Sequence, residues 1–281
     1  MKKFLAVLLS ACLLAGSVAA LSACGDNGKE TLTVYTNAAF APWEYVDENG
    51  NAVGVDIDIA YEIGDILGYN VQIRDVDFGA IFTGVQGDEM AIGLAGITIT
   101  PEREESGIFS IEYATSTQYA IVEDSVAADR SNLSEDGKLL VTALEGMRIG
   151  TQESTTGSIL VDEAINGSED EDTGEHIKGD LEGTETSQID YANIILAGQN
   201  LGGQIDAIVI DELPAHSVGD DMNGYTVIEL DAEPESYGIY LNKNATKLRD
   251  DINAVLEVMI DSGVIDYYIL KHSGAIIGSA D

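Results

Sequence analysis

The sequence predicts an α/β protein that is built as two lobes. Strand-like apolar runs alternate with helical patterns, which is typical of a parallel sheet covered by helices. The alternation occurs in two successive series, which begin near residues 31 and 118. A last strand and helix follow the second series and need a sheet to join. We expect them to return to the short edge of the first sheet, so that the chain crosses between the lobes twice.

The elements of the first series follow one another closely. Residues 32–35 alternate as a strand, and a helix that starts at Asp56 places its isoleucines on one stripe. A strand over 71–76, a short helix over 78–85 and a buried strand over 91–96 follow. This order predicts mostly parallel strands with helices on both faces of the sheet.

The second series repeats this pattern. We expect strands over 119–122, 147–150 and 205–210, and helices over 156–165 and from Glu212.

The chain then returns with a strand over 237–241 and a helix whose start Thr246 is placed to cap. The apolar residues of this helix share one face, and they are Leu248, Ile252, Val255, Leu256 and Met259.

A long insertion over 166–188 interrupts the second series. It contains an acidic run, Ser168–Glu175, without the full spacing of a calcium-binding loop. We therefore expect a solvated, mobile loop there.

The charge of the chain excludes several classes of partner. Its formal charge is -37, and its 13 Lys and Arg residues are scattered. A nucleic-acid surface needs clustered cations, so we expect no nucleic-acid partner. The three histidines, His176, His216 and His272, lack metal-binding spacing. We expect neither a metal nor a cofactor.

The N-terminus has the composition of an export signal. Two lysines precede an apolar run, and Leu21-Ser-Ala-Cys24 is followed by polar residues. This string resembles the bacterial lipobox, which is cut before a cysteine that then carries lipid. An earlier copy that ends at Cys12 is followed by apolar residues instead. A permanent membrane helix is the alternative. Cleavage before Cys24 would leave one cysteine and no intrachain disulfide.

A candidate binding site follows the last strand of the first series. Ligands of open α/β sheets lie beyond the carboxyl ends of strands, where Gly96 to Arg103 is expected. Thr100-Pro-Glu102 is typical of a helix start, with an N-cap followed by proline at the first position. The Arg103 guanidinium in that turn suits a planar carboxylate. The alternative is an ordinary helix start with a surface ion pair at Arg103.

Several blocks of sequence together resemble the polar amino-acid-binding proteins of ABC importers. These are solute-binding proteins with the type 2 periplasmic-binding fold. The blocks are Thr36-Asn-Ala-Ala-Phe-Ala-Pro-Trp-Glu-Tyr45, Val53-Gly-Val-Asp-Ile-Asp58, Asp77-Phe78, Ala95-Gly-Ile-Thr-Ile-Thr-Pro-Glu-Arg103, Ile149-Gly-Thr-Gln-Glu-Ser-Thr-Thr-Gly157 and Ile205-Asp-Ala-Ile-Val-Ile-Asp211. The resemblance covers roughly residues 31 to 272. It implies a binding protein without enzymatic activity that delivers an L-amino acid to a membrane permease.

The resemblance also implies roles for residues in the two lobes. Arg103 would clamp the α-carboxylate of the ligand, helped by Thr98 and by a backbone N–H near Thr156. Asp211 would take the α-ammonium, helped by the Gly96 carbonyl.

The ligand side chain would extend towards a second group of residues. Phe40 and Phe78 would flank it, and Trp43 is a further candidate; ordinary core packing is the alternative for all three. The family often has an acid at the position of Asn37, which would suit a cationic ligand. Asn37 and Gln152 are instead neutral amides, so we expect a polar, uncharged ligand such as glutamine.

Two other functions are consistent with this fold. Some relatives are dehydratases that act on prephenate-like acids, and a sensor module would use the same two lobes to signal. Sensors are usually joined to a membrane-spanning segment, and nothing sufficiently apolar follows the last expected helix, so we favour transport.

The expected organisation divides the chain into five parts. They are a signal peptide over 1–23, a lipid-anchored tether over 24–30, a discontinuous first lobe over 31–116 and 235–272, a second lobe over 117–234, and a tail over 273–281. We expect the mature protein on the extracytoplasmic face of the cell membrane, held by lipid on Cys24.

Overall fold

The computed structural model describes residues 28–169, 176–189, 201 and 203–277. Thr31–Asp281 form one compact unit, and the description below concerns this unit. None of the described helices is long and apolar enough to cross a membrane. The expected signal peptide and Cys24 lie outside the described residues.

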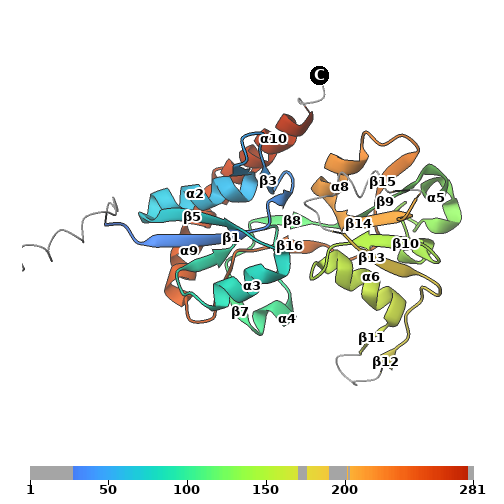
Figure 1. Ribbon diagram of the computed structural model, residues 1–281, viewed down its shortest axis with the longest axis horizontal. Helices are drawn as coiled ribbons and strands as arrows, with labels where there is room; N and C mark the ends of the chain where they lie inside the picture. The colour runs from blue at the N-terminus through green and yellow to red at the C-terminus, as the bar shows by residue number, and fades with distance from the viewer. Residues whose placement is uncertain (1–27, 170–175, 190–200, 202, 278–281) are drawn as a thin grey trace, which may run out of the picture. The chain divides into compact units, whose positions relative to one another are not determined.

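The first sheet has five strands in the order β5-β1-β6-β17-β7 (Figure 1). They are β5 (Asn70–Asp75), β1 (Thr31–Thr36), β6 (Ala91–Gly93), β17 (Tyr240–Asn242) and β7 (Gly107–Phe109). β1 pairs in parallel with β5 and β6, whereas β17 is antiparallel to both of its neighbours. The returning strand thus lies inside the sheet and not at its edge as expected, because β7, which the sequence did not reveal, adds beyond it.

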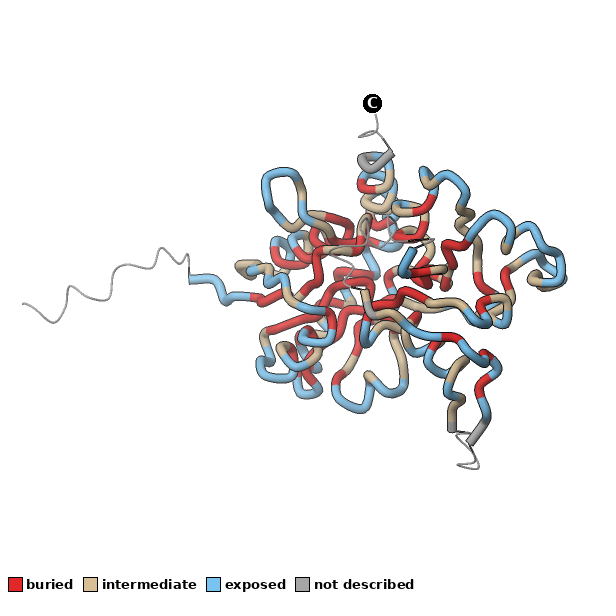
Figure 2. The backbone as a smooth tube through the Cα atoms, turned by 45° about the vertical axis from the view of Figure 1, so that its right-hand side comes forward, coloured by how far each residue is buried: buried red, intermediate tan, exposed pale blue. Residues whose placement is uncertain are grey.

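Helices cover both faces of this sheet. α2 (Val55–Leu67), α9 (Thr246–Asp261) and α10 (Val264–Ile277) pack together on one face. α3 (Phe78–Gln86) packs on the other face, against β1, β6 and β17. Leu32 and Val34 of β1 belong to the core under α2, while Tyr35 packs with the core under α3. Figure 2 shows the buried residues along the inner segments of the backbone and the exposed ones mainly on the outer loops.

The second sheet has the order β13-β10-β14-β9-β15. Its strands are β13 (Glu185–Gln188), β10 (Arg148–Thr151), β14 (Ala207–Asp211), β9 (Gln118–Glu123) and β15 (Tyr225–Glu229). Only β9 runs against the others, as its antiparallel pairing with β14 and β15 shows. The helices around it are α6 (Thr156–Asn166), α8 (Glu212–Gly219) and α5 (Asp124–Ala128), with short 3-10 turns at Arg130–Asn132 and Val141–Leu144.

Two strands join the lobes. β8 (Ala114–Ser116) and β16 (Glu235–Tyr237) pair antiparallel and lie between the two sheets in Figure 1. The expected two-lobed α/β fold with mostly parallel sheets and two crossings is therefore confirmed. A small meander of β2 (Ala39–Phe40), β3 (Glu44–Val46) and β4 (Ala52–Val53) precedes α2.

Three expectations about the bounds of elements were wrong. The expected strand over 237–241 is two strands, β16 and β17, interrupted at Gly238 and Ile239. The expected strand over 91–96 stops at Gly93. Thr246 is the first residue of α9, Ala245 precedes it, and no side chain caps this end.

The segment over 166–188, expected to be a loop, contains strands in its described part, whereas residues 170–175 of its acidic run lie outside the described residues. β11 (Ser168–Glu169) and β12 (His176–Ile177) pair with each other, and β13 extends the second sheet. The sequence of β13 is polar because it lies at the edge of that sheet, so apolar alternation does not reveal it.

The sequence also did not reveal α10, which includes residues that were expected to form a tail. Its inward stripe includes His272, which is 5% exposed and lies 2.8 Å from Asp58 and 3.2 Å from the Tyr45 hydroxyl. A polar residue on the inward face breaks the apolar pattern on which helix prediction depends.

Candidate functional site

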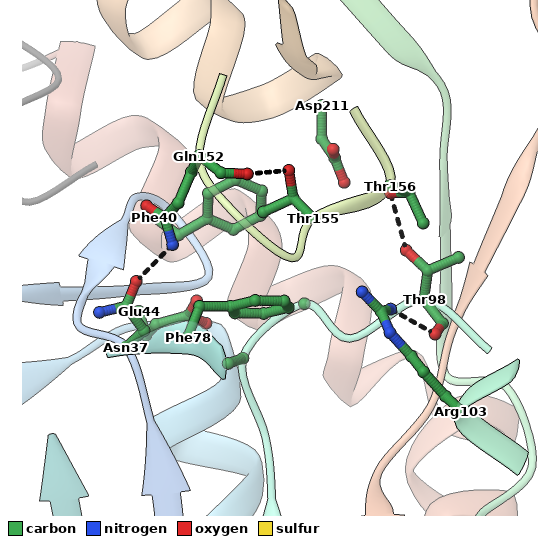
Figure 3. Close-up of a pocket in the computed structure, with 12 residues that line it drawn as sticks. Asn37, Phe40, Glu44, Phe78, Thr98, Arg103, Gln152, Thr155, Thr156 and Asp211 are labelled. Atoms are coloured by element: carbon green, nitrogen blue, oxygen red, sulfur yellow. Dashed lines mark hydrogen bonds between the residues drawn. The ribbon is translucent and has the colours of Figure 1, made fainter. Parts of the chain in front are cut away.

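A cavity lies between the two lobes, at the carboxyl ends of the strands (Figure 3). It encloses about 340 Å³ of empty space, counted with the part that is open to solvent. The lining residues are Asn37, Phe40, Glu44, Phe78, Ala95, Gly96, Thr98, Arg103, Gln152, Thr155, Thr156 and Asp211. On the first lobe they come from the β1–β2 connection, β2, β3, the start of α3, the segment after β6 and the short helix α4 (Pro101–Glu104). On the second lobe they come from the β10–α6 connection, the start of α6 and the end of β14.

Arg103 is placed by a short helix, α4 (Pro101–Glu104), that starts as the sequence predicts. Thr100 is its N-cap, and the Thr100 hydroxyl accepts a hydrogen bond from the Arg103 N–H at 3.3 Å. The guanidinium carbon lies 5.5 Å from the ring centroid of Phe78 and 5.2 Å from that of Phe82. These contacts hold the cation by cation–π attraction on the first-lobe side of the cavity.

The Arg103 guanidinium has donors to spare. It donates to the Thr98 carbonyl at 2.7 Å and to the Ser154 carbonyl, on the opposite lobe, at 3.0 Å. In the described part of the chain it forms no ion pair. Burial lowers its pKa, and the carboxylates of Glu235 and Asp211 oppose that shift. A guanidinium has five N–H donors, so this cation can still bind an anion.

Asp211 ends β14, and its side chain points into the cavity from the second lobe. Gln118 Nε2 donates to its Oδ1 at 2.6 Å, and the Tyr237 hydroxyl donates to its Oδ2. Burial raises the pKa of Asp211 to about 7, and the negative charge of Glu235 adds to the shift. The same burial, with Asp211 nearby, raises the pKa of Tyr237 well above its usual value. A positively charged group in the cavity would relieve the cost of ionising Asp211.

The opposite end of the cavity is lined by two side-chain amides. Gln152 Nε2 donates to Asn37 Oδ1 across the lobes at 3.0 Å, and Asn37 Nδ2 donates to the Val76 carbonyl at 2.9 Å. In Figure 3 the rings of Phe40 and Phe78 lie between this amide pair and Arg103. The cavity thus has a charged end and an amide end, with aromatic walls between them.

Two buried carboxyls, those of Glu44 and Asp56, lie close to each other. Glu44 lines the cavity and is 1% exposed, and its Oε2 has no hydrogen-bond partner in the described structure. Burial and the nearby Asp56 raise the pKa of Glu44 well above its usual range. Burial also raises the pKa of Asp56 to about 6, although the Gly96 N–H and the Tyr113 hydroxyl donate to it. Burial thus opposes the ionisation of Glu44.

Gly96 allows the backbone to turn at the cavity wall. Its φ of 53° is left-handed, and a Cβ on this residue would lie 3.0 Å from a ring carbon of Phe40. The backbone can turn here and let the Phe40 ring lie close because Gly96 has no side chain.

The structure brings together nine of the ten expected ligand-contacting residues. Trp43 is the exception. It is 2% exposed and packs edge-on against Tyr113 and Tyr237, at centroid distances of 6.3 and 5.0 Å, so the structure places it in the core. Sequence reasoning did not identify the cavity residues Glu44, Ala95 and Thr155. Glu44 and Thr155 lie inside blocks that carried the family resemblance, but no local signal separated them from their neighbours.

Within the described residues there is no cluster of His, Cys, Asp and Glu side chains able to hold a metal ion. The two charged groups on opposite walls of an interlobe cavity define a protein that binds a small polar solute between its lobes. The chain belongs to the bacterial extracellular solute-binding proteins of family 3, whose model matches residues 32–275.

Individual relatives extend along nearly the whole chain. It is 28% identical to the arginine-binding extracellular protein ArtP of Bacillus subtilis (strain 168), covering 95% of this chain and 96% of ArtP. It is 27% identical to the ABC transporter glutamine-binding protein GlnH of the same strain, covering 94% and 91%. An ancestral arginine-binding protein bound to arginine superposes with a TM-score of 0.70 at 30% identity, covering 87% of this chain and 98% of that structure. These relatives are binding proteins and not enzymes.

The raised pKa of Asp211 predicts how stability changes with pH. The native carboxyl keeps its proton up to about pH 7, whereas the unfolded one loses it near 3.8. The native state therefore binds more protons between these values, and the free energy of unfolding falls as pH rises from about 4 to about 7. Asp211→Asn removes this contribution, so its free energy of unfolding should fall less steeply. Urea denaturation of the ligand-free protein at about pH 5 and about pH 8 measures the difference.

Asp206→Asn is the matched control, since Arg148 holds the pKa of Asp206 below its usual value. The Asp206 carboxylate is ionised in the native and the unfolded state between about pH 5 and about pH 8. The free energy of unfolding of this variant should therefore change with pH as steeply as that of the wild type. A slope unchanged by Asp211→Asn would contradict the assignment.

Proposed function

We propose that the chain is the substrate-binding protein of an ABC importer, which captures a polar L-amino acid between its lobes and delivers it to a membrane permease. One observation carries this proposal: Arg103 and Asp211 face the same cavity from different lobes. An amino acid has a carboxylate and an ammonium on one carbon. It can therefore pair with both groups at once and link the lobes.

Closure follows from this division of the site. Two hydrogen bonds already join the lobes, one from Arg103 to the Ser154 carbonyl and one from Gln152 to Asn37. A ligand adds further contacts only when both lobes reach it. It therefore shifts the equilibrium towards the closed form by its extra affinity for that form. A permease that contacts both lobes would distinguish the closed form from the open one.

The amide end of the cavity supports a neutral polar side chain, such as that of glutamine. Asn37 and Gln152 each carry amide donors and an acceptor, and burial raises the pKa of Glu44, which opposes its ionisation. The main rival ligand is arginine, which the relatives ArtP and the ancestral protein bind by name. A guanidinium would need an ionised carboxylate at this end, and Glu44 is the carboxyl that lines it.

Removal of the Arg103 guanidinium should weaken binding strongly. Arg103→Ala would leave the ligand carboxylate buried without its cation, which costs about 2–5 kcal/mol, or about 30- to several-thousand-fold in affinity. A thermal-shift screen of the twenty amino acids identifies the best ligand of the wild type. Isothermal titration calorimetry then measures the affinity of the wild type and the variants for it. Arg148→Ala is the control, because Arg148 pairs with Asp206 outside the cavity. Equal affinity of Arg103→Ala and the wild type for the best amino acid would refute the proposed function.

A single charge at the amide end should change ligand preference. Asn37→Asp places a carboxylate beside Gln152, so arginine should bind at least about tenfold better relative to glutamine than it does to the wild type. Competition calorimetry with the two amino acids gives this ratio. The exposed Asn244→Asp adds the same charge on the surface and should leave the ratio unchanged. If the wild type already prefers arginine by a large factor, the neutral-ligand assignment fails.

We further propose that lipid on Cys24 holds the protein at the outer face of the cell membrane. The support is the string Leu21-Ser-Ala-Cys24, followed by polar residues. With its net charge of -37 the chain has no electrostatic attraction to anionic lipid, so an acyl anchor would supply the affinity. Cys24→Ser should abolish the incorporation of radiolabelled palmitate into the protein, because the acyl chain would be attached there. Cys12→Ser should leave the labelling intact; equal labelling of the two variants would exclude the anchor.

A further inference from the structure

Glu235 lies at the lobe junction, on the crossing strand β16, and contacts the ligand-facing hydroxyls of both lobes. Its Oε2 accepts from the Thr98 hydroxyl at 2.6 Å and from the Thr156 hydroxyl at 2.8 Å. Its Oε1 accepts from Gln118 Nε2 at 2.9 Å, and that same amide donates to Asp211 at 2.6 Å. Thr98 and Thr156 line the cavity, whereas Glu235 lies behind them.

These bonds decide which way the hydroxyl protons point. A threonine hydroxyl has one proton to donate and two lone pairs to accept with. When Thr98 and Thr156 both donate to Glu235, their protons point away from the cavity and only acceptors remain on its side. Together with the Asp211 carboxylate, they form a patch with acceptors and no hydroxyl donors. Such a patch matches the N–H donors of an ammonium and repels a carbonyl or carboxylate oxygen.

We infer that Glu235 is a positioning residue that makes the site selective for a ligand with an α-ammonium group. This inference rests on the proposed function and deepens it, because it reassigns Thr98 from the ligand carboxylate to the ligand ammonium. Arg103 alone then supplies the side-chain recognition of the carboxylate. The site discriminates an amino acid from the same acid without its amine, because only the amine pairs with the acceptor patch.

The arrangement is complete only when the lobes are closed. Thr98 follows β6 of the first lobe, and Thr156 begins α6 of the second lobe. Glu235 joins them through one oxygen atom, from a strand that belongs to the crossing. The acceptor patch therefore forms as the cleft closes, and selection for the ammonium takes place in the closed state.

Glu235→Gln is the direct test. An amide at this position has one acceptor and one donor end, so it conflicts either with the two hydroxyls or with the Gln118 amide. If it donates to the threonines, their protons turn towards the ligand ammonium. Calorimetry would use two matched pairs of probes: L-glutamine with glutaramic acid, and L-arginine with 5-guanidinopentanoic acid. In each pair the second compound is the first without its α-amino group.

For the better-bound pair, the wild type should prefer the amino acid by at least about 100-fold, and Glu235→Gln should reduce this ratio by at least about tenfold. The affinity for the deaminated compound should barely change. Glu233→Gln removes the same charge from an exposed position two residues away and should keep the wild-type ratio. Thr98→Val removes one acceptor without changing the charge and should also reduce the ratio, which decides the matter if Glu235→Gln does not fold.

Three results would overturn the inference. Glu235→Gln and Thr98→Val could both keep the wild-type ratio, or Glu235→Gln could weaken both members of a pair equally, as a purely structural role would. In these two cases the proposed function stands. If the wild type binds no amino acid at all, the inference and the proposed function fail together.

Discussion

The site depends on two carboxylates, Asp211 and Glu235, that lie close together at the junction of the lobes. Gln118 donates to both through one amide nitrogen, and burial together with the charge of Glu235 raises the pKa of Asp211. Two like charges in a poorly solvated place are costly unless donors or a cation surround them. The surrounding hydroxyls of Thr98, Thr156 and Tyr237 supply the donors. The ammonium of a ligand would supply the cation.

The acceptor patch and Arg103 are complementary because they face the same cavity with opposite charge. Without a ligand, each group is satisfied by protein: the guanidinium by backbone carbonyls and the carboxylates by hydroxyls and an amide. These partners are neutral, so they meet the hydrogen-bonding needs of the charged groups without neutralising them. A zwitterion provides two opposite charges at the right ends, and the gain is large where water is scarce. The affinity for an amino acid therefore comes from charged groups of the site that their neutral protein partners leave without a counter-charge.

Much of the fold could be predicted from sequence because its signals are local. The alternation of strands and helices and the start of the helix at Pro101 each depend on neighbouring residues, and both were confirmed. Other features depend on contacts between distant parts of the chain. The position of β17 inside the sheet depends on β7, and the inward His272 of α10 is satisfied by Asp58 and Tyr45. For the same reason Glu235 is a plain acid in the sequence, since its partners lie 79 and 137 residues away.

The position of Glu235 on a crossing strand has a consequence for how affinity and closure are related. A residue fixed to one lobe could orient one hydroxyl whether the cleft is open or closed. Glu235 bonds to hydroxyls from both lobes, so the acceptor patch and the closed geometry form together. A ligand that binds this patch gains the additional binding free energy only in the closed form. This difference in affinity between the two forms is what allows a ligand to drive closure. A ligand without an ammonium could still pair with Arg103, which the first lobe alone presents. It would occupy the open form with little bias towards the closed one. Selectivity for amino acids and the ability to signal occupancy thus arise from the same hydrogen bonds.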